Sequence, residues 1–119
     1  MYVSRWLNEQ YSAPENLGAM INSKKSEYDP CISREEALLV FTSANREDTF
    51  GKGDLYVSKL NDNKNWLQAI NLGRSFNTEA REYCAYFSSD SKYFFFSSEG
   101  DVKWIDAQVL KNQVQKISD

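Results

Sequence analysis

Short apolar runs separated by polar turn residues recur along the chain and predict a series of β-strands. Residues 37–42 and 92–97 are apolar or aromatic nearly throughout, as expected for strands that are covered on both faces. Clusters of Asn, Asp, Ser and Gly lie between such runs and indicate turns. The strands predicted in this way cover residues 2–7, about 10–17, 28–33, 37–43, 54–60, 66–72, 82–88, 92–98 and 101–106.

Near the C-terminus the pattern changes to helical spacing. Ala107, Leu110, Val114 and Ile117 fall at i, i+3, i+7 and i+10, which places them on one face of an α-helix. Asp106 precedes this run and is a suitable N-cap. We therefore predict a helix over residues 107–117 whose apolar stripe packs against the rest of the fold. Contact of this stripe with a partner is the alternative.

The pattern of strands and turns occurs about twice in the sequence. Residues 2–43 match residues 56–98 at an offset of 54 for the first segment and of 55 for the later ones. A third, partial copy starts at residue 100, where GDV repeats the GDL of residues 53–55 at an offset of 47. A period near 50 with about four short strands is typical of the blades of a β-propeller.

The repeated segments resemble the WD40-like repeats of TolB-type bacterial β-propellers. The similar stretches are residues 29–48, 53–60, 71–98 and 100–107, nearly the whole chain apart from the C-terminal helix. Family members typically carry a Ser-Pro-Asp-Gly turn before an apolar strand, and this chain has SREE and then SSDS in that place. The resemblance implies antiparallel blades. It does not fix the function, because such repeats serve protein contacts, carbohydrate or peptide binding, and sometimes catalysis.

The predicted strands are too few for a closed propeller, which usually has about four to eight blades. An incomplete set of blades leaves apolar faces and open strand edges uncovered, so we expect self-association. A rearranged antiparallel sheet capped by the helix is the alternative fold. We expect a single domain over 1–119, made of a partial first repeat (1–27), a central blade (28–73), a truncated blade (82–106) and the helix (107–117).

Composition restricts the chemistry. A formal net charge of -3 and scattered basic residues argue against a nucleic-acid surface. The chain has no histidine, so the commonest general base and transition-metal ligand are missing. No nucleophile paired with a base, phosphate-binding glycine motif or zinc spacing is visible, so we expect no enzyme, cofactor or metal. Cys31 and Cys84 lie in strand-like stretches and are expected to be buried free thiols, with a disulfide as the alternative.

No apolar stretch approaches the length of a membrane-spanning helix, and the first residues are too polar for a signal peptide. We therefore expect no membrane partner. The chain as given indicates a cytoplasmic protein, or a periplasmic one if a leader has been removed.

Acidic residues recur at equivalent places in the repeat. Asp54 and Asp101 precede equivalent strands and are expected to accept hydrogen bonds from turn backbone, with cation binding as the alternative. Glu27 and Glu82 are expected to serve the structure of the repeat, although two carboxylates at a fixed separation are also what glycoside hydrolysis requires. The repeated Asn-Leu-Gly at residues 16–18 and 71–73 predicts a turn in which glycine adopts a conformation that other residues resist.

Two sets of residues are candidates for a binding surface. The long loop 44–53 is the first, because such loops often carry function; the second set is large aromatic residues, which we expect to pack between blades and which would be partner anchors wherever they are exposed. The loop candidates are Arg46, Glu47, Asp48 and Phe50, and the aromatic candidates are Trp6, Tyr11, Trp66 and Trp104.

We therefore expect a non-catalytic protein-interaction or assembly module with a protein or peptide partner. A carbohydrate-active or hydrolytic propeller remnant that uses carboxylates is one alternative, and a truncated gene product without a selected ligand is another.

Overall fold

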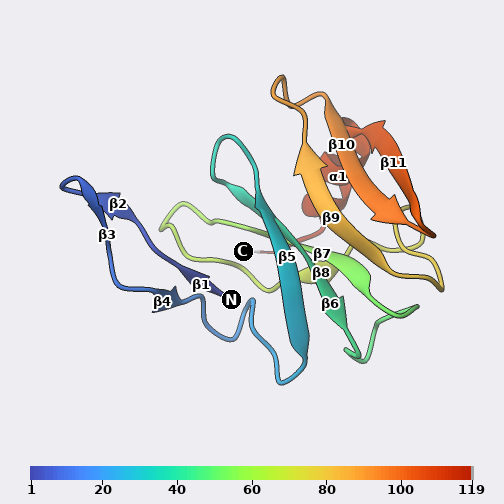
Figure 1. Ribbon diagram of the computed structural model, residues 1–119, viewed down its shortest axis with the longest axis horizontal. Helices are drawn as coiled ribbons and strands as arrows, with labels where there is room; N and C mark the ends of the chain where they lie inside the picture. Colours follow the sequence, from blue (N-terminus) through green and yellow to red (C-terminus); the bar gives the residue numbers. More distant parts are fainter. Residues whose placement is uncertain (119) are drawn as a thin grey trace.

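The computed structural model describes residues 1–118, and it is mainly β with antiparallel sheets and one C-terminal helix (Figure 1). The N-terminal hairpin comprises β1 (Tyr2–Val3), β2 (Trp6–Leu7), β3 (Gln10–Tyr11) and β4 (Glu15–Asn16), in which β1 pairs with β4 and β2 with β3. The central sheet comprises β5 (Ser26–Ile32), β6 (Leu38–Ala44), β7 (Asp54–Lys59) and β8 (Ile70–Asn71), paired in that order. The C-terminal sheet comprises β9 (Glu82–Phe87), β10 (Tyr93–Ser98) and β11 (Asp101–Asp106), with β10 in the middle, and α1 (Ala107–Val114) follows.

The predicted mainly β, antiparallel fold with a C-terminal helix is confirmed. Every predicted strand range overlaps an observed strand, although the ranges 2–7 and 10–17 are each divided into two two-residue strands and β8 is reduced to two residues. Residues 1–118 do not close into a ring, so the propeller stays a prediction. Two repeated turns also agree with the sequence: Gly18 and Gly73 have φ of +82° and +77°, and the Asn two residues earlier accepts a hydrogen bond from each glycine N–H at 2.8 Å.

The hairpin, the central sheet and the C-terminal sheet lie in a row in chain order. We call the face of each on the side of later residues its forward face and the opposite face its backward face, also at the two ends of the row. The larger core lies between the forward face of the central sheet and the backward face of the C-terminal sheet. The buried residues of this core are Val40, Leu55, Val57, Leu72, Phe76, Phe94, Phe96, Leu110, Val114 and Ile117.

The last three members of that core come from α1 and the turn after it, so the predicted packing face of the helix is confirmed. The helix is shorter than predicted, because it ends at Val114 while Ile117 remains buried in the following turn. Asp106 caps it by accepting a hydrogen bond from the N–H of Gln108 at 2.8 Å.

A second core lies between the N-terminal hairpin and the backward face of the central sheet. Its buried members are Ile21, Leu39, Phe41, Tyr56 and Ala69, with Met1, Leu17 and Trp66 packed against them.

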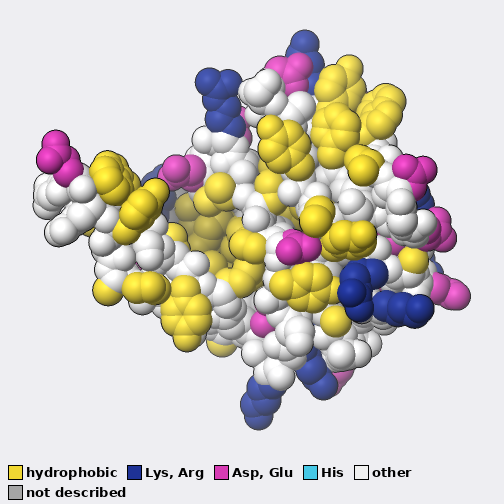
Figure 2. Space-filling view, viewed as in Figure 1, with side chains coloured by type: hydrophobic (Ala, Val, Ile, Leu, Met, Phe, Trp, Pro, Cys, Tyr) yellow, Lys and Arg dark blue, Asp and Glu magenta, His cyan; other side chains and the backbone are white. Residues whose placement is uncertain are grey.

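Large apolar side chains also remain exposed at both ends of the row of sheets. Figure 2 shows them gathered over the C-terminal sheet at the upper right and over the N-terminal hairpin at the left. Each sheet covers the face of its neighbour, and the two outward faces have no neighbouring sheet within residues 1–118.

Candidate functional site

The repeated glutamates are held in the same turn in both copies. Thr78 donates to the Glu82 carboxylate from its N–H at 3.1 Å and its hydroxyl at 2.6 Å, and Ser98 donates at 2.6 Å. One repeat earlier, Ser23 donates to Glu27 from its N–H at 3.3 Å and its hydroxyl at 2.5 Å. Both carboxylates therefore organise the turn that leads into the first strand of a sheet, as the sequence predicted.

Asp54 also accepts hydrogen bonds from backbone N–H groups of its own loop. It accepts hydrogen bonds from the N–H of Phe50 at 2.8 Å and of Gly51 at 3.2 Å, and from the side-chain amide of Asn71 at 2.7 Å. Asp101 differs, since it is exposed and accepts a bond from the N–H of the next residue, Val102. The expected hydrogen bonds from turn backbone are therefore confirmed for Asp54 but not for Asp101, because Val102 belongs to strand β11.

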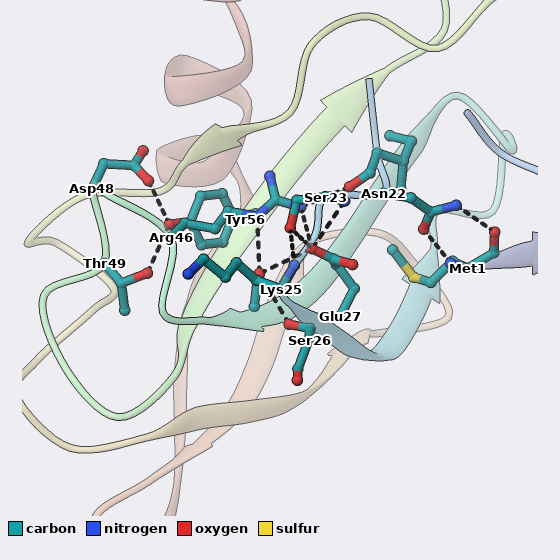
Figure 3. A network of polar contacts seen from close by, with 12 residues as sticks. Met1, Asn22, Ser23, Lys25, Ser26, Glu27, Arg46, Asp48, Thr49 and Tyr56 are labelled. Carbon is teal, nitrogen blue, oxygen red and sulfur yellow. Dashed lines mark hydrogen bonds and ion pairs between the residues drawn. The ribbon is translucent and has the colours of Figure 1, made fainter. Parts of the chain in front are cut away.

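Arg46 points inward and joins the turn after β4 to the central sheet (Figure 3). Its guanidinium donates to the backbone oxygen of Ile21 at 2.6 Å, to Ser43 at 2.9 Å and to Glu27 at 2.9 Å. It also lies over the rings of Phe41 and Tyr56, at 5.3 and 4.7 Å from their centroids. With 12% of its side chain exposed, Arg46 is a clamp between the turn after β4 and the central sheet, not part of an open surface.

The clamp sets the protonation of its partner. Burial opposes ionisation of the Glu27 carboxyl, but hydrogen bonds from Ser23 and Arg46 and the charge of Arg46 outweigh it, so the pKa of Glu27 is lowered. A carboxyl group with a lowered pKa is ionised at neutral pH and is poorly suited to act as a general acid.

The rest of loop 44–53 is largely engaged in its own network. The carboxylate of Asp48 accepts a hydrogen bond from the hydroxyl of Tyr56 at 2.7 Å, and the backbone oxygen of Asp48 accepts one from Asn71. Burial raises the pKa of Tyr56 to about 12. Glu47 and Phe50 are exposed, and the guanidinium of Arg74 lies 4.2 Å from the centroid of the Phe50 ring. Of the four loop candidates, Arg46 turns inward, whereas Glu47, Asp48 and Phe50 are exposed, so a binding surface on this loop stays a prediction.

The four candidate aromatics divide into two groups. Trp66 packs against the second core, as expected. Trp6, Tyr11 and Trp104 are 61, 70 and 64% exposed, so the expectation that they are buried between blades is wrong. Each lies on an outward face that no sheet within residues 1–118 covers. Because exposed Trp and Tyr side chains often supply binding energy at interfaces, each becomes a candidate anchor for a partner.

Trp104 belongs to a larger apolar surface on the forward face of the C-terminal sheet. Phe95 lies opposite Trp104 on one side and opposite Tyr86 on the other, so the three residues form a row across β11, β10 and β9. The ring of Tyr93 meets Trp104 edge to face at 5.4 Å. We call this surface the terminal aromatic face and define it by five residues: Tyr86, Tyr93, Phe95, Val102 and Trp104.

The second exposed surface lies on the N-terminal hairpin. Trp6 and Tyr11 are paired across β2 and β3, and their rings meet edge to face at 4.9 Å. Tyr2, on β1, is 65% exposed. We call these three residues the N-terminal aromatic face.

The thiols give no sign of a nucleophile. Both cysteines are free, as expected, but Cys31 is only half-buried and Cys84 is exposed, so the expectation of two buried thiols is wrong. Cys84 has a φ of +52° and lies in the irregular part of the β9–β10 pairing, where the strand's alternation is broken. Desolvation and the nearby Asp29 carboxylate raise the pKa of Cys84, and burial raises that of Cys31. A thiol is a weak nucleophile when its pKa is raised.

A shallow groove between β5 and β9 is one of the concave features of the described residues. Its lining includes Tyr28, Asp29, Arg81, Tyr83 and Glu99. No group of three or more acidic or cysteine side chains in the described part of the chain is arranged to hold a metal ion.

Comparison with family models, with curated proteins and with solved structures finds no match to the chain. Among residues 1–118, no helix is both long enough and apolar enough to cross a membrane. The resemblance to TolB-type repeats stays a prediction that rests on the repeated segments of the sequence.

Proposed function

We propose that the protein is a non-catalytic interaction or assembly module built from propeller-like repeats, and that the terminal aromatic face is its protein contact surface. The observation that carries this proposal is that the equivalent face, one repeat earlier in the same chain, is the core of a sheet-to-sheet interface.

The equivalence follows from strand pairing as well as from sequence. Val40 lies opposite Val57 and Cys31 in the central sheet, and Phe95 lies opposite Trp104 and Tyr86 in the C-terminal sheet. The repeat offsets of 55 and 47 relate the two sets residue by residue. Val40 and Val57 are fully buried under the C-terminal sheet, whereas Trp104 is 64% exposed.

The size of the surface supports a contact. A large aromatic side chain covers about 150–250 Å². Weighted by their exposed fractions, Tyr86, Tyr93, Val102 and Trp104 together leave roughly 400–500 Å² of side chain open to solvent. Contiguous apolar patches beyond a few hundred Å² on a soluble protein mark interaction sites. Trp and Tyr are also the residues that most often supply binding energy at protein interfaces.

The hydrolytic alternative has less support. Glu27 and Glu82, the carboxylates that the repeat would place side by side, are tied to Ser and Thr side chains of their own turns. The groove carboxylates of Asp29 and Glu99 are exposed, and Glu99 is paired with Lys103 at 3.1 Å.

A photo-crosslinker tests the proposed contact surface. Trp104→p-benzoylphenylalanine should give protein adducts on irradiation in native cells, because the side chain lies in the centre of a surface that a protein covers. Asn63→p-benzoylphenylalanine, in the exposed turn between β7 and β8, is the matched control and should give few. Equal adduct yields at the two positions would contradict the proposal.

A further inference from the structure

We infer that the partner of the terminal aromatic face is a second copy of this chain, which contributes its N-terminal aromatic face. This inference rests on the proposed function and identifies the partner. It follows from the way in which residues 1–118 pack their own sheets. The same contact, forward face against backward face, occurs twice, and one forward face and one backward face remain uncovered.

Both internal interfaces are made in the same sense, forward face to backward face. In the second core, Met1, Leu17 and Ile21 lie against Leu39 and Phe41. In the larger core the equivalent residues take the same places, 54 or 55 positions later. They are Leu55, Leu72 and Phe76 on one side and Phe94 and Phe96 on the other.

Polar contacts repeat with the apolar ones. The side-chain amide of Asn77 brackets Leu55, accepting from its N–H at 2.8 Å and donating to its carbonyl at 3.0 Å. Asn22 brackets Met1 in the same way, accepting from its amino group and donating to its carbonyl at 2.8 Å. Both the apolar and the polar parts of the contact are thus repeated, which shows that the faces are built to a common pattern.

Two faces remain after the internal interfaces are made. The terminal aromatic face is a forward face, and it needs a backward face to cover it. The backward face of the N-terminal hairpin is uncovered within residues 1–118. The repeat offsets make Tyr2 on this face equivalent to Tyr56. They also make the pair Trp6 and Tyr11 equivalent to the bridged pair Leu60 and Trp66. Tyr56 and Trp66 are the residues with which the central sheet meets its own neighbour.

The hairpin of the second copy would therefore pack beside the C-terminal sheet as the next sheet in the row, not as a missing strand of that sheet. Residues 1–118 of each chain supply three positions: the hairpin, the central sheet and the C-terminal sheet. Two chains joined head to tail at both ends supply six positions, within the range of about four to eight at which propellers close. A contact between unlike faces forms a closed assembly when its rotation permits.

Sedimentation of paired variants tests the inference. The wild-type chain should sediment at twice its mass of 13.8 kDa. Trp104→Glu and Tyr2→Glu place a charge on opposite partners of the same contact, and each should raise the dimer dissociation constant at least about tenfold. Asn63→Glu carries the same charge on an exposed turn and should leave the mass unchanged.

Mixing the two variants separates a head-to-tail contact from a symmetric one. Trp104→Glu retains an intact N-terminal aromatic face, and Tyr2→Glu retains an intact terminal aromatic face. An equimolar mixture should therefore form a mixed dimer that neither variant forms alone. Tyr11→Glu serves as a second N-terminal variant, and circular dichroism confirms that each variant is folded.

Three outcomes would overturn the inference: a wild-type monomer at several hundred micromolar, a single variant whose dimer dissociation constant equals that of the wild type, or a mixture that associates no more tightly than either variant alone. Crosslinking separates this failure from that of the proposed function. Adducts from position 104 that join a different protein would leave the interaction module standing and remove the second copy as its partner. Adducts no more frequent than at position 63 would remove both.

Discussion

Arg46 should be the side chain of loop 44–53 on which stability depends most. Arg46→Met removes the cation while keeping much of its aliphatic volume, and it leaves Glu27 without its ion-pair partner. Removing one partner of a buried ion pair costs about 3–5 kcal/mol, and a hydrogen bond to a charged group contributes about 1.5–3 kcal/mol. Because Glu27 keeps its bonds from Ser23, we expect the lower end, a loss of about 3 kcal/mol in the free energy of unfolding.

Urea unfolding followed by circular dichroism measures this loss, at one fixed protein concentration because association itself shifts stability. Arg46→Lys keeps the charge but not the planar fork that reaches three acceptors, so it should lose about 1–2 kcal/mol. Arg74→Met is the matched control, since Arg74 is exposed and contacts the Phe50 ring alone among the described interactions; it should lose less than about 1 kcal/mol.

A loss at Arg46→Met no larger than that at Arg74→Met would refute the clamp. A double-mutant cycle with Glu27→Gln isolates the ion pair from the other contacts of Arg46, and the coupling energy should be about 1 kcal/mol or more. Additive losses in that cycle would show that the guanidinium acts through the Ile21 carbonyl and the aromatic rings instead.

Two further predictions concern the same fold. The lowered pKa of Glu27 means that its carboxylate stabilises the folded state at pH values above its ordinary pKa of 4.5, and that this contribution is lost as the pH falls through the lower folded value. The stability difference between wild type and Glu27→Gln should therefore shrink below about pH 4.5 in urea titrations, and a difference that grows there would contradict the assignment. Gly51→Ala should lower the free energy of unfolding, measured by urea titration, by about 1–3 kcal/mol, because its Cβ would lie 2.4 Å from the Ala80 carbonyl oxygen. An unchanged free energy of unfolding would show that the loop yields freely.

The strands and the helix could be predicted from the sequence because their signals are local. Short apolar runs, an N-cap at Asp106 and repeated Asn-Leu-Gly turns each act within a few residues. The role of Arg46 could not be predicted in the same way. It lies in a polar loop that has the composition of a solvated segment, and its acceptors on Ile21 and Glu27 lie 25 and 19 residues earlier in the chain.

The exposed aromatic residues show a second reason why the sequence does not predict the whole structure. Alternation along a strand shows which side chains share a face, but it does not show whether another sheet covers that face. Phe41 and Trp104 look equally apolar in the sequence, yet Phe41 is fully buried and Trp104 is open. Cys84 shows the effect of a local irregularity, since its positive φ breaks the alternation on which the expectation of burial depended.

The position of α1 bears most directly on what the open face is for. The helix carries an apolar stripe of the kind that covers an exposed sheet, and it follows β11 directly. Yet Leu110, Val114 and Ile117 pack into the core on the backward side of the C-terminal sheet, together with Val57 and Phe94, and they leave the forward side uncovered (Figure 1). In repeat proteins each unit is stabilised by its neighbours, and a terminal unit that ends an array carries a polar outer face. The forward face here carries Trp104 and Tyr93 in place of such polar residues, which is the composition of an internal position in a row of sheets and supports a further sheet beyond it.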